Sequence, residues 1–291
     1  MRGRVVGLVA CFMAIGCIST PRASAQDGAP PSTPVAHTYR DVDGTALKLY
    51  VFTPTGSSRS GRAPAILLFH GGGWSAGAPD WTFDSARRYA GLGLVALSVQ
   101  YRLSTDQHTP IDALADVCHA FQWVRARAVS LGVDSRRVAA SGVSAGGHLA
   151  AAAATIGCGN AEGQFGNGGP DALVLWSPAL DVSGDGHFRR LLRGRAGVDA
   201  YSPVEHVRPR MPPTHIVQGE RDTLTPLSGA RRFCDRVSAG GGQCDLVVYP
   251  GVGHLLTRNL ANQESDFDPD PATRDDGNAK QLAFLKALWI R

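Results

Sequence analysis

RRVAASGVSAGGHLAAAAAT, residues 136–155, is the stretch of sequence that decides the fold. Its first residues are typical of a buried strand, and the alanine-rich part that begins at Ala145 is typical of a helix. Between them, residues 142–146 read Gly-Val-Ser-Ala-Gly. This strand–turn–helix context is what a nucleophile elbow requires, because only small flanking residues leave room for a serine on so tight a turn. Ser144 is therefore the candidate nucleophile; the alternative is a small-residue turn in which Ser144 only caps the helix.

A serine is a poor nucleophile at neutral pH, so it needs a base, and the base needs an orienting acid. Where a nucleophile elbow is present, these groups follow in the chain order serine, acid, histidine. Asp222 comes directly after one strand-like segment, and His254 comes directly after the next. Glu220 and Asp181 are alternative acids. Among the nine histidines, His254 is the predicted base because it lies late in the chain, at the exit of a strand.

Residues 71–73 are three consecutive glycines at the end of an apolar run. Attack on a carbonyl group places negative charge on its oxygen, and backbone N–H groups stabilise that charge where no side chain blocks them. Gly72, Gly73 and Ala145, the residue after the candidate nucleophile, are therefore the predicted donors of an oxyanion hole. The alternative is a merely flexible turn. Trp74, which follows the glycines, is a predicted wall of the substrate pocket.

Strand-like and helix-like segments alternate along the rest of the chain. The apolar runs 63–69 and 93–102 are typical of strands covered on both faces. Further helices are expected at residues 110–133 and 278–290. This alternation predicts an α/β fold with a mostly parallel, doubly wound sheet and helices on both faces, as a three-layer domain. Residues 183–208 interrupt the alternation and are predicted to form a small insertion.

The N-terminus is predicted to be a signal peptide, residues 1–25, with two early arginines, a short apolar core and an Ala-Ser-Ala cleavage site. A lipid anchor at Cys17 is the alternative, and the apolar core is too short for a membrane span. Residues 26–36 are a proline-rich lead-in, predicted to be disordered, and residues 37–291 are predicted to be one catalytic domain. Removing three arginines leaves a net charge of 4 − 3 = +1, which gives no reason to expect a nucleic-acid partner.

Four cysteines remain after the predicted cleavage: Cys118, Cys158, Cys234 and Cys244. In an exported chain, four cysteines predict a disulfide framework, with three possible pairings. Cys234 and Cys244 lie on either side of a predicted helix end, glycine turn and strand start, which favours their pairing and leaves Cys118 with Cys158. The spacings are unlike those of zinc sites.

The motifs HGGGW (70–74), YRLS (101–104), SGVSAGGHLA (141–150), SPALD (177–181), GERDTLTP (219–226) and GVGHLL (251–256) occur in this order. Together they resemble the acetyl esterase/lipase branch of the α/β-hydrolases, which includes hormone-sensitive-lipase-like and feruloyl esterase-like enzymes. The resemblance implies Ser144 as nucleophile, Asp222 as orienting acid and His254 as base, with Gly72, Gly73 and Ala145 in the oxyanion hole.

The resemblance also implies hydrolysis of carboxylic esters through an acyl-enzyme, with no metal and no organic cofactor. Short acyl groups, such as acetyl esters of carbohydrates or small alcohols, are the expected substrates. Val143 stands where the hormone-sensitive-lipase-like group commonly has aspartate, and residues 26–36 are too few for that group's N-terminal cap. Both departures favour the compact enzymes of this branch, which carry the SAGGHLA motif, and speak against a deep, lipase-like acyl site.

Two other functions are compatible with the same residues. One is amide or peptide hydrolysis by the same triad, and the other is a non-catalytic hydrolase-fold binding protein. The predicted location is the periplasm or the exterior of the cell, and the sequence leaves the oligomeric state open.

Overall fold

The computed structural model describes residues 33–54, 61–158 and 168–290. Eight strands form one sheet in the order β1-β2-β4-β3-β5-β6-β7-β8. The strands are β1 (Val35–Val42), β2 (Thr45–Phe52), β3 (Ala63–Phe69), β4 (Val95–Val99), β5 (Val133–Val143), β6 (Ala172–Trp176), β7 (Thr214–Gly219) and β8 (Cys244–Tyr249). The pairs β1–β2 and β2–β4 are antiparallel and all other pairs are parallel, so the carboxyl ends of β3, β5, β7 and β8 meet at one edge.

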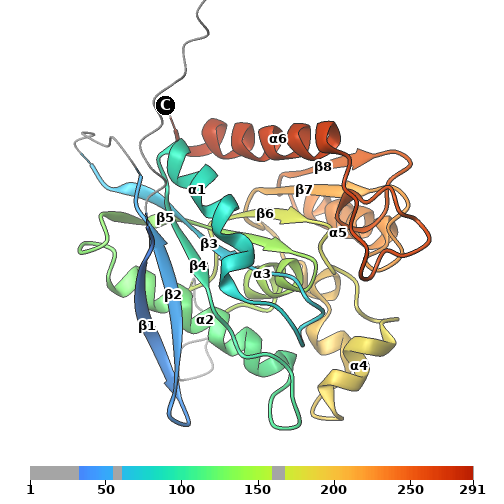
Figure 1. Cartoon of the computed structure of the whole chain (residues 1–291), viewed down its shortest axis with the longest axis horizontal. Coiled ribbons are helices and arrows are strands. Elements are labelled where there is room, and N and C mark those ends of the chain that lie inside the picture. The colour runs from blue at the N-terminus through green and yellow to red at the C-terminus, as the bar shows by residue number, and fades with distance from the viewer. Residues whose placement is uncertain (1–32, 55–60, 159–167, 291) are drawn as a thin grey trace, which may run out of the picture. The chain divides into compact units, whose positions relative to one another are not determined.

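Helices cover both faces of the sheet (Figure 1). On one face lie α1 (Phe83–Leu92) and α6 (Pro271–Trp289), which share a core with Ile66 and Leu68 of β3. On the other face lie α2 (Pro110–Ala126), α3 (Ala145–Thr155) and α5 (Leu227–Ala239), which share a core with Leu67 and Phe69 of the same strand. Alternate residues of one strand thus serve the two cores, which explains why its sequence is a continuous apolar run. The predicted three-layer α/β fold is confirmed.

The predicted insertion lies between β6 and β7. It contains α4 (Gly186–Leu192, yellow in Figure 1) and two short 3₁₀ helices, η2 (Val198–Tyr201) and η3 (Pro203–His206). Asp185 begins α4, because its side chain accepts hydrogen bonds from the backbone N–H groups of His187 and Phe188.

Several boundaries differ from those expected. Strand β1 begins at Val35, so the predicted lead-in ends two residues earlier than residue 36. Helix α6 begins at Pro271 rather than at residue 278, since Asp270 caps it by accepting from the Thr273 N–H. Its polar first turns carry no apolar period, which is why the sequence pattern missed them. The predicted signal peptide, Cys17 and the lead-in up to residue 32 lie outside the described residues.

Two disulfides join elements of the domain as predicted. Cys118 in α2 pairs with Cys158 beyond α3, with Cα atoms 5.1 Å apart. Cys234 in α5 pairs with Cys244 at the start of β8, with Cα atoms 5.2 Å apart. Such bonds persist in oxidising compartments. Among the helices of the described residues, none has the length and apolar character needed to cross a membrane.

Candidate active site

The turn between β5 and α3 has the geometry of a nucleophile elbow. Ser144 has φ 53° and ψ −117°, a conformation that non-glycine residues rarely adopt. A Cβ atom at Gly142 would lie 2.3 Å from the Gly146 carbonyl oxygen, and one at Gly146 would lie 2.2 Å from the Phe69 carbonyl oxygen. Both glycines are therefore required by backbone contacts, which accounts for the small residues on either side of the serine.

Ser144, His254 and Asp222 form a continuous chain of hydrogen bonds. The Ser144 Oγ lies 3.0 Å from the His254 Nε2, and the His254 Nδ1 lies 2.9 Å from the Asp222 Oδ2. Because a carboxylate only accepts, Nδ1 carries the proton and Nε2 is free to accept the proton of the serine hydroxyl. The imidazole therefore has the tautomer that a general base for Ser144 needs.

The Asp222 carboxylate is buried and well supplied with donors. Its Oδ1 accepts from the backbone N–H groups of Leu224 (3.0 Å) and Thr225 (2.8 Å). Its Oδ2 accepts from the Thr225 hydroxyl (2.8 Å) and the Gln218 amide (2.9 Å) in addition to His254. These bonds hold the charged carboxylate at a fixed orientation in the protein interior.

The alternative acids have other partners. The exposed Glu220 carboxylate accepts from the Gly251 N–H at 3.1 Å, and Asp181 forms an ion pair with Arg232 at 3.0 Å. Of the three acids considered, only Asp222 reaches His254.

The three glycines lie beside Ser144. A Cβ atom at Gly71 would be 3.4 Å from the Ser144 Cβ. Gly72 and Gly73 both have positive φ, 108° and 58°. A Cβ at Gly72 would lie 2.2 Å from the Ala76 carbonyl oxygen, whereas at Gly73 the nearest atom would be the His187 Nε2 at 3.3 Å. Gly72 is thus required by the turn itself, whereas a Cβ at Gly73 would meet only the His187 ring, whose Nε2 lies 3.1 Å from the Gly73 carbonyl oxygen.

Trp74 is almost completely buried, with 3% of its surface exposed. Its indole N–H donates to the His148 Nδ1 at 3.1 Å, and its ring packs on Phe188 of α4 with centroids 4.8 Å apart. The contacts of Trp74 in the structure are therefore packing contacts, and its predicted contact with substrate stays a prediction.

His148 joins three parts of the site, which the sequence did not indicate. It lies in α3, one turn after Ser144, and its Nε2 donates to the Tyr201 carbonyl oxygen of the insertion at 2.7 Å, while Nδ1 accepts from Trp74. Burial lowers the pKa of His148 to about 4, so the ring is neutral at pH 7. The spacing of four residues places His148 one turn after the candidate nucleophile, and this is the signal in the sequence that could have found it.

His70 shapes the start of the glycine turn. Its ring stacks on Tyr101 with centroids 4.3 Å apart, and the Tyr101 hydroxyl donates to the His70 carbonyl oxygen at 2.7 Å. Its Nδ1 donates to the Gly71 carbonyl oxygen at 2.7 Å, and burial lowers the pKa of this imidazole. His70 therefore acts on the backbone of the turn.

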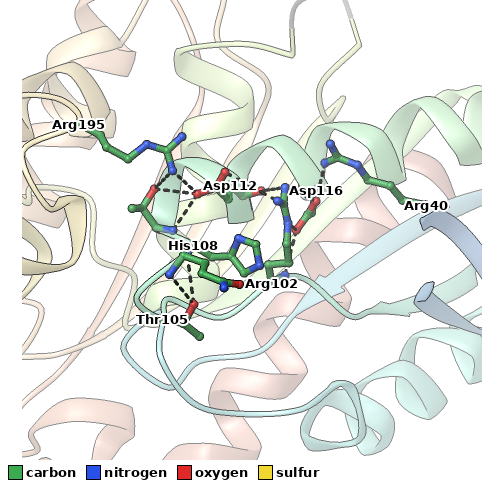
Figure 2. A network of polar contacts seen from close by, with 9 residues as sticks. Arg40, Arg102, Thr105, His108, Asp112, Asp116 and Arg195 are labelled. Atoms are coloured by element: carbon green, nitrogen blue, oxygen red, sulfur yellow. Dashed lines mark hydrogen bonds and ion pairs between the residues drawn. The ribbon is translucent and has the colours of Figure 1, made fainter. Parts of the chain in front are cut away.

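Ion pairs fix the insertion to the N-terminus of α2 (Figure 2). The Arg195 guanidinium donates to Asp112 at 2.6 Å and to the Thr109 hydroxyl at 3.2 Å. In the same network, Arg40 and Arg102 converge on the buried carboxylate of Asp116. The insertion is therefore held at the site by charged contacts as well as by His148.

Within residues 33–54, 61–158 and 168–290, no group of three or more His, Cys, Asp or Glu side chains is arranged to hold a metal ion.

Comparison with known proteins agrees with the fold. The model of a family with the α/β-hydrolase fold matches residues 66–258, more than half of the chain. The chain belongs to this family. A solved structure of esterase 2 from Thermogutta terrifontis is similar to this chain, with a TM-score of 0.77 and 30% sequence identity. The similarity covers 90% of this chain and 97% of the esterase.

Two curated relatives of this α/β hydrolase come from Mycobacterium tuberculosis. Esterase LipC is 29% identical over 66% of this chain and 53% of its own length. The probable carboxylic ester hydrolase LipM is 28% identical over 67% of this chain and 49% of its own length. The chain thus spans about half the length of these two relatives.

Proposed function

We propose that the protein is a serine esterase in which Ser144 attacks a carboxylic ester. The hydrogen-bond chain from the Ser144 Oγ to the His254 Nε2 at 3.0 Å, continued to Asp222 at 2.9 Å, is the observation that carries this proposal. The names of the relatives and of the structural neighbours support the same chemistry.

In the proposed reaction, His254 takes the hydroxyl proton as the Ser144 Oγ bonds to the ester carbon. Charge on the carbonyl oxygen is stabilised by N–H groups of Gly72, Gly73 and Ala145. The tetrahedral intermediate collapses, His254 returns the proton to the leaving alcohol, and an acyl-enzyme remains. Water then attacks the acyl group with His254 as base, which releases the acid and restores the serine.

We propose short-chain acyl esters as substrates, on small alcohols or carbohydrates. Structures of the Thermogutta terrifontis esterase 2 are described as propionate bound and butyrate bound, and this neighbour is 29–30% identical to the chain. Hydrogen bonds and ion pairs fix the insertion beside the glycine turn, as from His148 to Tyr201 and from Arg195 to Asp112. An insertion held in this way favours a substrate site of fixed size over one that opens for long acyl chains.

We also propose export, with cleavage after Ala25, to the periplasm or the cell exterior. The two disulfides support an oxidising destination. The intact mass of the protein recovered outside the cytoplasm tests the cleavage site, because a chain that retains residues 1–25 or carries lipid at Cys17 contradicts it.

The test of the esterase is hydrolysis of p-nitrophenyl esters of increasing acyl length, with a fluorophosphonate probe in parallel. The wild type is expected to hydrolyse the acetyl ester fastest and to react with the probe. Ser144→Ala is expected to lose the probe reaction and about 10⁴-fold or more of kcat. Ser141→Ala is the matched control, since Ser141 is a buried serine that lies three residues earlier in β5.

Each outcome has a definite reading. A wild type that neither hydrolyses esters nor reacts with the probe contradicts the proposal. Equal activity of the wild type and Ser144→Ala would mean that another residue is the nucleophile. Faster hydrolysis of p-nitroacetanilide than of the acetyl ester would assign the amide hydrolase function instead.

A further inference from the structure

The segment 258–270, which follows His254, has one buried side chain, Gln263, and this side chain reaches both loops of the acid–base pair. Gln263 is 5% exposed, although most residues around it in the segment 258–270 are exposed or half-buried. A buried amide needs partners for its oxygen and its nitrogen. Those partners are backbone groups next to Asp222 and His254.

Three hydrogen bonds connect the Gln263 amide to the site. Its Oε1 accepts from the backbone N–H of His254 at 2.8 Å and from that of Thr223 at 3.1 Å. Its Nε2 donates to the Arg221 carbonyl oxygen at 3.0 Å. One side chain thus holds the residues on both sides of Asp222 and the backbone of His254 itself.

The backbone around His254 depends on outside support. The two residues that follow it, Leu255 and Leu256, both have positive φ, 55° and 63°. Leucine reaches this region only at a cost, so the turn persists because its surroundings hold it. A Cβ atom at Gly253 would lie 2.5 Å from the Gln263 amide carbon, which shows how closely the amide covers this turn.

The loop that presents Gln263 is itself fixed. Arg258 forms an ion pair with Asp268 at 2.8 Å, and the Asn259 amide donates to Asp266 at 2.7 Å. Thr257 pairs with Pro269 in a short β-bridge. These contacts close the loop at its base, so the position of Gln263 is set before substrate arrives.

We propose that Gln263 is a positioning residue for catalysis, which sets the separation between the Asp222 loop and the His254 loop. This inference rests on the proposed esterase function. Gln263 is 5% exposed and bonds backbone groups rather than substrate. Its loss therefore moves the His254 imidazole away from Ser144 and leaves the pocket for the ester unchanged. A displacement of about 1 Å at a reacting group lowers the rate by about a hundredfold.

The test replaces Gln263 by methionine, which keeps the length of the side chain and removes its hydrogen bonds. We expect Gln263→Met to lower kcat for the acetyl ester by ten- to a hundredfold, an order-of-magnitude range, with KM little changed. The rate of fluorophosphonate labelling should fall by the same factor. Circular dichroism and thermal unfolding establish that the variant is folded.

Gln281→Met is the matched control. Gln281 lies in α6, away from the triad, and is also 5% exposed. Its amide nitrogen donates to the Leu175 carbonyl oxygen at 3.3 Å, and its amide oxygen accepts from the Tyr89 hydroxyl at 3.3 Å. It should lower the melting temperature as Gln263→Met does while keeping the wild-type kcat. A Gln263→Met variant with wild-type kcat, or a loss of kcat that Gln281→Met shares, overturns the inference.

A second variant tests the contact from the other side. Gly253→Ala pushes a methyl group into the Gln263 amide, so it should lower kcat by a similar factor. In a Gln263→Ala background the same change no longer meets the three amide atoms that lie nearest to the new Cβ, and it should then cost little further activity. If the factors by which the two single changes lower kcat multiply in the double mutant, the inference is contradicted. An inactive wild type would instead contradict the esterase function, so the two failures are distinguishable.

Discussion

The two halves of the candidate site are built in different ways. On the nucleophile side, the glycine turn and the elbow fit together backbone against backbone, as the close approach of Gly146 to the Phe69 carbonyl oxygen shows. On the acid–base side, Asp222 and His254 occupy loops that side chains such as Gln218 and Gln263 hold by hydrogen bonds. Steric contact between backbones dictates residue type, whereas hydrogen bonds between loops do not. The backbone contacts of the first half are therefore visible in the sequence as small-residue motifs, whereas the supporting side chains of the second half, such as Gln263, are not.

The largest effect should come from removing the charge on the acid–base side. Asp222→Asn keeps the shape of the side chain but presents an amide to the His254 Nδ1, which favours the wrong tautomer. We expect kcat to fall by about 10⁴-fold with KM little changed. Kinetics on the acetyl ester measure this change.

Glu220→Gln is the control for Asp222→Asn. Glu220 precedes the same loop, but its carboxylate is exposed and bonds only the Gly251 N–H among the described residues. Wild-type kcat is expected. If Glu220→Gln were the more damaging of the two, the acid would be misassigned.

On the nucleophile side, Gly72 and Gly73 should separate stability from activity. Gly72→Ala forces a Cβ to 2.2 Å from the Ala76 carbonyl oxygen at a φ of 108°, so overpacking and backbone strain add. We expect a loss of roughly 4 kcal/mol in the free energy of unfolding. At Gly73 the φ angle is 58°, and a new Cβ would meet only the His187 side chain. Gly73→Ala is therefore expected to lower the free energy of unfolding by roughly 1 kcal/mol.

Urea unfolding of the two variants measures this difference. Equal losses in the free energy of unfolding would show that the turn relaxes around Ala76, and that contact with the backbone is not what requires a glycine at position 72. Gly73→Ala, being folded, then reports on catalysis alone.

This contrast explains what the sequence predicted and what it left out. The fold followed from continuous apolar strands and from small residues at the elbow, because both patterns are imposed by local packing. Ser144, Asp222 and His254 were found from their order at strand ends, and the structure brings them together. Gln263 gave no signal, since a polar residue in a polar loop looks the same whether it is exposed or buried. The contacts of His148 gave no signal because its partners, Trp74 and the Tyr201 carbonyl oxygen, come from segments distant in the chain.

An effect smaller than that of Gly72→Ala should appear as acid sensitivity of the nucleophile side. His148 has a pKa of about 4 in the folded protein, below the value of about 6.5 for an unfolded histidine, because it is buried; the nearby Asp185 acts in the opposite direction. The unfolded chain therefore binds the proton more tightly. The stability that this histidine contributes is complete above about pH 6.5 and is lost as the pH falls toward about 4. Protonation also removes the Nδ1 acceptor of the Trp74 indole.

His148→Gln isolates this effect, because glutamine keeps a donor for the Tyr201 carbonyl oxygen and does not titrate. Between about pH 7.5 and about pH 5, the wild type should lose roughly 2 kcal/mol more of its free energy of unfolding than the variant. The other histidines with lowered pKa, His70, His119 and His215, are common to both proteins and cancel in the difference. Urea unfolding followed by tryptophan fluorescence measures it. Parallel pH profiles for the two proteins would show that His148 is not the acid-sensitive contact.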